Sequence, residues 1–463
     1  MGGSAGSRRS RLRPAGDARR VVVIGASMSG ALAAVTCAAN GRDVTVLERD
    51  VLPSEPQTRP GVPQAGQPHV LLQRGLLALE RLLPGLRKEL VEAGAVSFNT
   101  SQLAWLAECG WLPTGLAGYE TLSLTRAVLD HAVLTRVRQT PGIDLRTGAT
   151  VTGLVRHGDA WSVQLRDGSC VVADLVIDAS GRNSRLPVWL DKLGYRPPAP
   201  TEVDARLGYA TRTVLLPADA IGVPGVLISH TPADPAGGIA FPVEGGRWLV
   251  TGIGCGQHRP PRDAAGLEAY FASLRDPALS AVLGRGEPVG DVRIHRHTGN
   301  VRRHYERMRT WPDGIIPVGD ALCAFNPSFG QGITVAACQA EVLHRQFRRG
   351  WRSGSTRRVI RRCARELALP WEIAVGEDQR HGPAAQRSRR LAAQGWWARR
   401  VQQLAVAGDE RAMTTLARVY NLMGSPLLLV HPALVVAAAR APSEDGGGVR
   451  PPALSALAKS ASP

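Results

Sequence analysis

The clearest pattern in the chain is a short run of branched apolar residues that ends in glycine. Residues 21–24 carry no polar side chain and are followed by Gly25. A run of this length without polar positions is typical of a strand buried on both faces of a parallel sheet. The alanine-rich segment 31–40 predicts a helix packed closely on that sheet, and Gly41 ends it. Residues 44–47 predict a second strand.

The same pattern of a buried strand followed by a glycine turn returns twice, much later in the chain. The run 174–178 leads to Ser180 and Gly181, and the run 314–318 leads to Gly319 and Asp320. The stretch 326–332, Asn-Pro-Ser-Phe-Gly-Gln-Gly, then opens a helix predicted over 333–343. Buried strands that alternate with helices predict an α/β fold with a parallel sheet.

The first turn has the chemistry of a dinucleotide-binding turn. Gly25 permits a tight turn, Gly30 lets the helix approach the sheet, and the helix N-terminus offers N–H groups to a pyrophosphate. Glu48 closes the second strand about twenty residues further on, where a carboxylate can accept hydrogen bonds from ribose hydroxyls and disfavours NADP. Ser27 replaces the middle glycine of G-x-G-x-x-G, which weakens the motif. This segment alone is compatible with NAD, with FAD or with a packing turn.

The two later turns favour FAD. Asp320 follows a strand, where its carboxylate can hold a ribitol chain. The glycine-rich helix start at 330–332 can receive the edge of a flavin ring that becomes negative on reduction. Three unrelated turns of a large α/β protein are the alternative interpretation, and the order of the segments speaks against it.

The order G-x-S-x-S-G, then D-A-S-G, then G-D-A with N-P-x-x-G-Q-G resembles the single-component, group A flavin monooxygenases of the p-hydroxybenzoate hydroxylase fold. Further segments are similar to the bacterial FAD epoxidases of polyether polyketide biosynthesis, the monensin and lasalocid type, which are related to squalene epoxidase; they lie at 48–50, 59–64, 181–190, 242–248 and 321–332. The resemblance covers most of the chain. Related oxidases of other bacterial natural products share these closer segments.

This resemblance implies an α/β fold with three parts: an FAD-binding Rossmann-like domain of the GR2 type, an antiparallel-sheet substrate domain and a C-terminal helical region. We expect the FAD domain to be discontinuous, at 18–73, 122–190 and 296–345. The substrate domain is then expected at 74–121 and 191–295, and the helical region at 346–440. A disordered basic tail is expected at 1–17 and a flexible tail at 441–463.

The resemblance also implies which residues meet a non-covalently bound FAD. Arg126 matches the arginine that contacts the flavin phosphates or the ribityl chain, although it could also be a helix-surface arginine. The expected contacts are Gly25, Ser27, Met28, Ser29, Gly30, Glu48, Arg49, Arg59, Gln64, Arg126, Asp178, Ser180, Gly181, Gly319, Asp320, Pro327, Gly330, Gln331, Gly332 and Ile333. Phe325, Asn326 and Pro327 are expected to face the flavin ring, with no conventional acid–base residue. Phe241 and Trp248 are candidates for the roof of an apolar substrate cavity, but core packing explains either one more simply.

The reaction that this resemblance implies is epoxidation. NAD(P)H reduces the FAD, O2 adds to form a C4a-hydroperoxide, and its distal oxygen passes to an alkene of a polyene or polyketide intermediate. That substrate is a free acid or is carried on an acyl-carrier protein, and Arg59 and the basic face could receive its carboxylate or carrier. The chain has no second complete dinucleotide fingerprint, as in enzymes where the nicotinamide meets a mobile flavin.

Other functions of the same fold stay open. A hydroxylase or an isoprenoid reductase would carry the same motifs. A halogenase is disfavoured because the chain lacks a W-x-W-x-I-P stretch. A lipid-binding escort without catalysis, like the GDP-dissociation inhibitors, is disfavoured by the intact second and third FAD segments.

The charge of the chain bears on which partners it could bind. The net charge of +17 comes almost entirely from arginine, since lysine occurs only at Lys88, Lys192 and Lys459. The charge is densest over 345–365, which we interpret as a solvated helix face and not as a nucleic-acid site, because no aromatic platform accompanies it. NADPH or an acyl-carrier protein could also be attracted to this face.

The cysteines and histidines give no support to metal chemistry. The seven cysteines include no C-x-x-C pair, and the eleven histidines include no H-x-x-x-H spacing. Reduced structural thiols are therefore expected, including Cys323 near the third FAD segment. The apolar stretch 426–439 is broken by His431 and Pro432 and predicts a packed helix pair and no transmembrane anchor. No apolar export region follows the basic N-terminus, and we expect a cytoplasmic protein.

Overall fold

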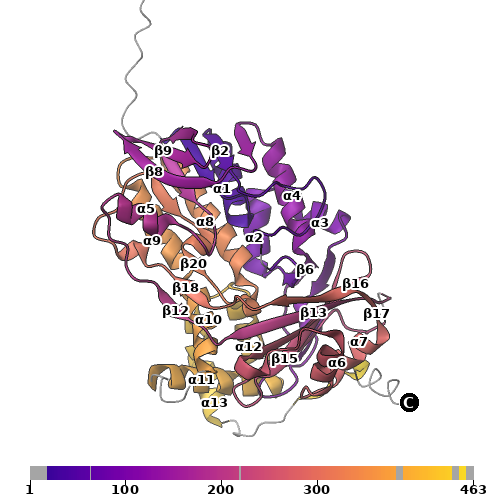
Figure 1. The fold of residues 1–463 in the computed structure, drawn as a ribbon. Coiled ribbons are helices and arrows are strands. Elements are labelled where there is room, and N and C mark those ends of the chain that lie inside the picture. The colour runs from indigo at the N-terminus through magenta and orange to yellow at the C-terminus, as the bar shows by residue number, and fades with distance from the viewer. Residues whose placement is uncertain (1–17, 63, 218–219, 382–388, 441–447, 455–463) are drawn as a thin grey trace, which may run out of the picture.

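A computed structural model describes residues 18–62, 64–217, 220–381, 389–440 and 448–454. The tails expected at 1–17 and 441–463 lie outside these residues, apart from 448–454. In Figure 1 the described chain forms an upper lobe around a parallel sheet and a lower lobe around a second sheet, with the last helices below. The domain boundaries given above stay a prediction.

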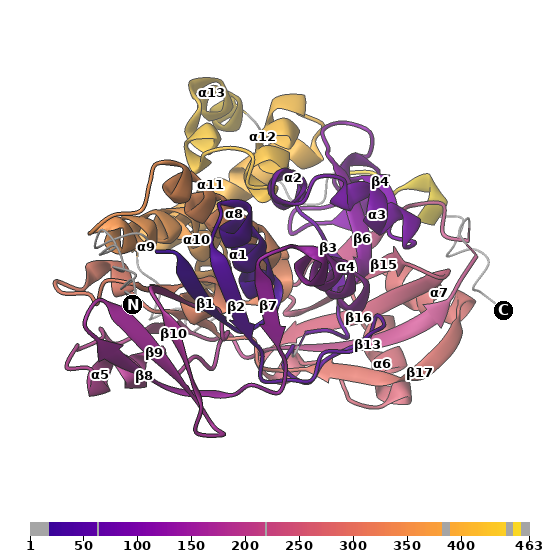
Figure 2. The same ribbon diagram turned by 90° about the horizontal axis from the view of Figure 1, so that it is seen from above.

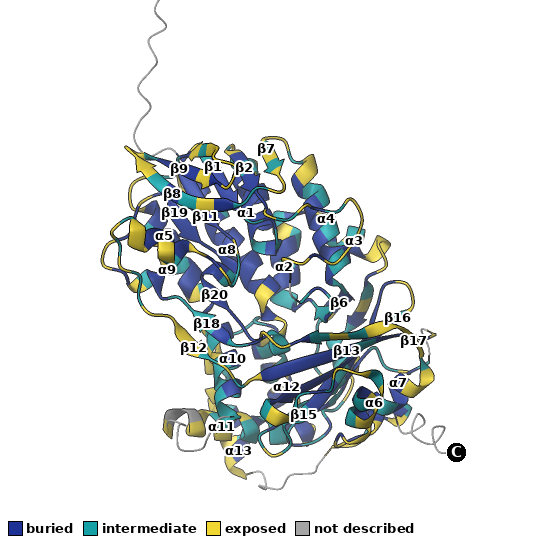
Figure 3. Cartoon of the chain, in the orientation of Figure 1, coloured by how far each residue is buried: buried dark blue, intermediate teal, exposed yellow. Residues whose placement is uncertain are grey.

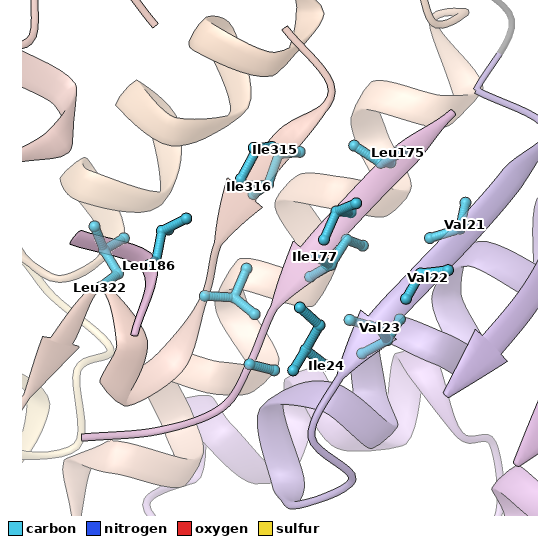
Figure 4. Close-up of a cluster of buried hydrophobic side chains, with 14 of the residues drawn as sticks. Val21, Val22, Val23, Ile24, Leu175, Ile177, Leu186, Ile315, Ile316 and Leu322 are labelled. Carbon is cyan, nitrogen blue, oxygen red and sulfur yellow. The ribbon is translucent and has the colours of Figure 1, made fainter. Parts of the chain in front are cut away.

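The upper lobe is built on a five-stranded parallel sheet. Its strand order is β19 (Ile315–Pro317), β11 (Leu175–Asp178), β1 (Arg20–Ile24), β2 (Asp43–Leu47) and β7 (Ile143–Arg146). Side chains of β1, β11 and β19 meet in one core, as Figure 4 shows for Val23, Ile177 and Ile316. The runs at 21–24, 174–178 and 314–318 thus contain buried parallel strands, as predicted.

Helices cover one face of this sheet and a small antiparallel sheet covers the other (Figure 2). The helices are α1 (Met28–Ala39), α4 (Arg126–Gln139) and α8 (Gln331–Arg348). The antiparallel sheet consists of β8 (Val151–His157), β9 (Ala160–Leu165) and β10 (Cys170–Ala173). Small residues in α1, such as Ala33 and Ala34, are buried and let the helix lie close to β1.

A six-stranded sheet forms the lower lobe. Its order is β17 (Glu287–His295), β13 (Leu207–Leu215), β16 (Arg247–Cys255), β15 (Ala236–Val243), β14 (Val226–Ile228) and β5 (Ala104–Leu106). Helices α6 (Ala264–Ala272) and α7 (Ala278–Arg285) pack on one face. The strand predicted over 249–254 is the middle of β16.

Short elements join the two lobes. One three-stranded sheet contains β3 (Pro68–Val70), β6 (Glu120–Thr125) and β4 (Val96–Asn99). Another contains β12 (Thr201–Val203), β18 (Asn300–Arg302) and β20 (Cys323–Ala324). Helices α2 (Gln73–Leu82), α3 (Leu86–Glu92) and α5 (Leu186–Lys192) lie around the upper lobe.

The chain ends in helices, as predicted: α9 (Ser355–Glu366), α10 (Ala368–Arg380), α11 (Arg389–Val406), α12 (Glu410–Tyr420) and α13 (Pro432–Arg440). The expected helix pair at 426–439 is a 3-10 turn, Pro426–Val430, followed by α13. Figure 3 shows much more exposed surface on these last helices than on the central sheet. Within the described residues, no helix combines the length and the apolar character that a membrane span needs.

Candidate functional site

A cavity of about 480 Å³ lies where the parallel strands end, between the two lobes. The turns after β1, β2 and β11, the first residue of α4 and the loop before α8 line one part of it. Strands β13, β15, β16 and β17 supply the roof. Crevices at the carboxyl ends of parallel strands are the usual ligand sites of such sheets.

The β1–α1 turn packs so closely on neighbouring backbone that its two glycines leave no room for a side chain. Gly25 has a φ of 97°, and a Cβ there would lie 2.6 Å from the carbonyl oxygen of Ala179. A Cβ on Gly30 would lie 1.9 Å from the carbonyl oxygen of Gly25. Ser27 precedes the first turn of α1 but its side chain forms no capping hydrogen bond, so the N–H groups there stay available to an anion.

Two buried arginines share one carboxylate beside this turn. Asp130 accepts hydrogen bonds from Arg126 Nε at 2.7 Å and from Arg59 Nη2 at 3.2 Å. Arg126 Nη2 also donates to Ser27 Oγ at 3.0 Å, while the buried Nε of Arg59 has no partner. Two guanidinium charges against one carboxylate leave a net positive charge at the cavity wall. This arrangement fits a pyrophosphate.

Glu48 fixes the turn from the end of β2. Its Oε2 accepts a hydrogen bond from the backbone N–H of Ala26 at 2.6 Å, and its Oε1 accepts one from Asp50 at 2.9 Å. Glu48, Arg49 and Gln64 all line the cavity.

Asp178 lies behind the cavity wall and does not line it. Its carboxylate is fully buried and accepts hydrogen bonds from the backbone and hydroxyl of Ser180 and from Ser184 Oγ. Burial raises the pKa of Asp178 and these hydrogen bonds oppose that rise. Asp178 therefore holds the turn that presents Ser180 and Gly181 to the cavity.

The segment after β19 likewise has one residue behind the cavity wall and one that lines the cavity. Gly319 stands behind the wall, where a Cβ would lie 2.0 Å from Ser29 Oγ, whereas Asp320 lines the cavity. Burial raises the pKa of Asp320, and the charge of Arg182 opposes the rise.

The loop before α8 is tightly organised. Asn326 Oδ1 accepts from the backbone N–H of Ser328 at 2.9 Å, and Asn326 Nδ2 donates to Asp378 of α10 at 2.6 Å. Gly332 has open space where a Cβ would stand, and the buried Gln331 Oε1 has no hydrogen-bond partner. Open space and an orphaned acceptor at the start of α8 fit the polar edge of a flavin ring.

The roof mixes polar and apolar side chains. Tyr209 donates to Asn326 Oδ1 at 3.3 Å and lies 2.8 Å from Ser328 Oγ. Thr251 and His295 add polar groups, and the buried Nε2 of His295 has no partner. Ile239 and Ile253 supply apolar surface. His69 of β3 also lines the cavity, and its pKa is lowered to about 4 by burial and by the charge of Arg126.

Phe241 and Trp248 do not line this cavity. Phe241 stacks on Phe98, with ring centroids 6.1 Å apart, in a cluster beyond Ile239. Trp248 points to the opposite face of the sheet and packs in the core formed with α6 and α7. For both residues the simpler interpretation, core packing, describes their position.

The sequence did not indicate three residues of the site. Tyr209, His295 and Gln67 line the cavity, and no local motif surrounds them. Asp378, which holds the loop from outside, lies in the segment 371–378, which is similar to a segment of the epoxidases. Only the alternation of polar residues along β13 and β16 could have indicated which face of the sheet meets the cavity.

The fold and the cavity fit those of FAD-dependent oxidoreductases. Residues 20–184 match the family described as FAD dependent oxidoreductase. Protein Rv3254 of Mycobacterium tuberculosis is 31% identical over 397 residues, which cover 81% of this chain and 82% of that protein. The chain belongs to the same family as this relative.

More distant relatives support the same fold. Kynurenine 3-monooxygenase of Salinispora tropica is 27% identical over 336 residues, covering 70% of this chain and 71% of that one. The structure of Klebsiella pneumoniae HpxO complexed with FAD and uric acid superposes with a TM-score of 0.60 at 19% identity, over 88% of this chain and 97% of that one. For p-nitrophenol 4-monooxygenase PnpA of Pseudomonas putida the TM-score is 0.61 at 17% identity, over 87% and 98%. The fold is that of flavin monooxygenases.

Proposed function

We propose that the protein is an FAD-dependent monooxygenase that uses NAD(P)H and O2 to epoxidise an alkene of a polyene or polyketide intermediate. One observation carries this proposal. A single cavity runs from the positively charged β1–α1 turn, past the loop before α8, to a roof formed by the second sheet. A cofactor and a second reactant would thus share one space. The relative named kynurenine 3-monooxygenase supports the monooxygenase class.

Each part of the cavity then has a task. Arg126, Arg59 and the start of α1 would hold the pyrophosphate, Glu48 the ribose and Asp320 the ribityl chain. The loop 325–332 would receive the ring. FAD, when bound, accepts electrons from NAD(P)H and activates O2.

The protein's own contribution is to orient the substrate and to exclude water. Ile239 and Val70 continue from the cavity into the apolar cluster of Phe98, Leu103 and Phe241. An alkene would lie against Ile239 and Val70 at this apolar end of the cavity. Because burial keeps the imidazole of His69 neutral at physiological pH, the wall beside the apolar end carries no added charge.

The polar half of the roof favours a second candidate function, hydroxylation of an oxygen-bearing substrate. Tyr209, Thr251 and His295 offer hydrogen-bonding groups there, and His295 Nε2 is unsatisfied. An intermediate with an alkene at one end and oxygen groups at the other would use both halves. A hydroxylase would use mainly the polar one.

The test is a two-stage experiment on the purified protein. The flavin is first reduced anaerobically with NADPH or NADH, and isotopically labelled O2 is then added with a polyene acid. An epoxide that carries the label supports the proposal, and a labelled alcohol supports the hydroxylase. Reduction without label in the product indicates a reductase. A protein that binds no FAD would be a non-catalytic relative and would refute both functions.

A further inference from the structure

Three side chains with metal-binding atoms meet outside the cavity. They are His230, just after β14, Cys255, at the end of β16, and His381, just after α10. One ligand atom from each lies within 4.8 Å of the other two. No sequence spacing could indicate this cluster, because its members are separated by 25 and 126 positions.

The metal-binding atoms of this cluster form few other contacts. In the part of the chain that the structure describes, no hydrogen bond ends on the sulfur of Cys255 or on the ring of His230, and the buried Nε2 of His381 has no hydrogen bond and only Glu377 Oε1 as an ion-pair partner, at 3.5 Å. The two imidazole rings stack, with centroids 5.0 Å apart and planes inclined by 11°. A buried imidazole nitrogen without a hydrogen bond, next to a buried thiol and a second imidazole, is a place for a ligand, since buried polar groups are normally paired.

The charges around the cluster suit a cation. Glu377 Oε1 lies 3.5 Å from His381 Nε2, and Glu377 also pairs with Arg380. A bound dication would displace the thiol proton, and the thiolate and the Glu377 carboxylate would balance its charge.

We propose that His230, Cys255 and His381 bind one divalent cation of the zinc class, with Glu377 placed to take the fourth position. Two imidazoles and a thiolate are typical zinc ligands and are poor ligands for magnesium or calcium. Zinc bonds of roughly 2.0–2.3 Å place tetrahedral ligand atoms about 3.5 Å apart. The cluster must therefore contract by about 1 Å. One ring must also turn out of the stack, because a metal lies in the plane of each imidazole it binds.

Such an ion would tie the C-terminal helices to the second sheet. His381 lies directly beyond α10, the helix whose Asp378 bonds the loop before α8, while the other two ligands belong to the sheet. The ion would thus stabilise the connection between these parts. It lies outside the cavity, so the inference does not depend on the proposed reaction.

The test measures zinc on the FAD-loaded protein without a histidine tag. The protein is dialysed against a chelator, and Zn²⁺ is added with a competing indicator. We expect one zinc per chain and a higher Tm with zinc than with chelator. The matched control is Cys170→Ser, which changes an exposed cysteine and should behave like wild type. Cys255→Ser should weaken binding by at least about 100-fold, because even loss of a supporting partner costs roughly 10- to 100-fold.

Two outcomes would overturn the proposal: zinc affinity that is the same in Cys255→Ser and in wild type, or no stoichiometric zinc in a wild-type protein that keeps its flavin. If Cys255→Ser fails to fold, the zinc X-ray absorption spectrum of the wild type shows which atoms bind the ion. One sulfur and two imidazole ligands support the site. A shell of oxygen atoms alone refutes it.

Discussion

Replacing Asp378 with alanine tests how the loop before α8 is held. Asp378 accepts hydrogen bonds from Asn326 Nδ2 at 2.6 Å and from Asn300 Nδ2 at 2.7 Å. Asn300 Oδ1 in turn accepts from the backbone N–H of Asn326 at 2.7 Å. Both asparagines are at most 2% exposed, so the alanine variant leaves the side-chain amide of Asn326 without an acceptor and that of Asn300 with only the Val203 carbonyl oxygen at 3.3 Å.

The expected loss of stability follows from the hydrogen bonds that these two amides give up. An unsatisfied buried donor costs about 1–3 kcal/mol. Burial of the carboxylate is itself unfavourable, since desolvation raises the pKa of Asp378 to about 6 against the hydrogen bond from Asn326. The net loss in free energy of unfolding for Asp378→Ala should therefore be about 2–4 kcal/mol.

Asp378→Asn should lower the free energy of unfolding less, by about 1–2 kcal/mol. The new amide keeps one oxygen acceptor but turns an N–H₂ group toward the second asparagine donor. The two asparagines cannot flip to compensate, because the oxygen of each is already occupied by a backbone N–H, that of Ser328 for Asn326 and that of Asn326 for Asn300.

Denaturant unfolding measures stability, and flavin fluorescence measures the Kd for FAD. The control is Asp159→Ala in an exposed turn, expected within about 0.5 kcal/mol of wild type. Because the loop borders the cavity, Asp378→Ala should also weaken FAD binding. A stability change no larger than that of the control, or a larger loss for Asp378→Asn than for Asp378→Ala, would refute this reasoning.

Three further predictions concern the cavity wall and one buried ion pair. Glu48→Gln removes the charge from the acceptor of the turn N–H at 2.6 Å and should weaken FAD binding about 10- to 100-fold in a titration of the apoprotein; an unchanged Kd would contradict it. Gly30→Ala places a methyl group 1.9 Å from the Gly25 carbonyl oxygen and should destabilise the chain by about 3 kcal/mol, and purification with full flavin content would contradict the steric argument. Glu341 lies between Arg74 and Arg81. Burial raises its pKa, but hydrogen bonds and charges from these arginines outweigh burial and hold the pKa below the ordinary value of 4.5. Its stabilisation is therefore present above the unfolded-state pKa and lost as pH falls through the folded-state pKa. Glu341→Gln should cost about 1 kcal/mol at neutral pH and flatten the acid limb of a stability profile, whereas parallel profiles would exclude the ion pair as the cause.

The sequence predicts the parallel sheet well because its signal is local. Each of β1, β11 and β19 contains at least three consecutive apolar residues and leads into a glycine turn, and burial on both faces requires such runs. The β1–α1 turn was predictable for the same reason, since Gly25 and Gly30 lie five positions apart.

The roof was not predictable, because its composition depends on which face of the second sheet turns inward. Thr251 and Ile253 face the cavity, whereas Trp248 on the same strand faces α6 and α7. A shift by one residue would reverse the faces. Phe241 lies on the inward face but beyond the cavity, against Phe98.

The hydrogen bond from Asn326 to Asp378 also sets an order of events during synthesis. Every glycine turn of the cavity lies before residue 333, so a ribosome has made the whole candidate cofactor site well before it reaches α10. Until α10 emerges, Asn300 and Asn326 lack the carboxylate that joins them. The nascent chain would therefore acquire its phosphate-binding turn early and its ring-facing loop late, and firm capture of the cofactor would report that the C-terminal helices have folded.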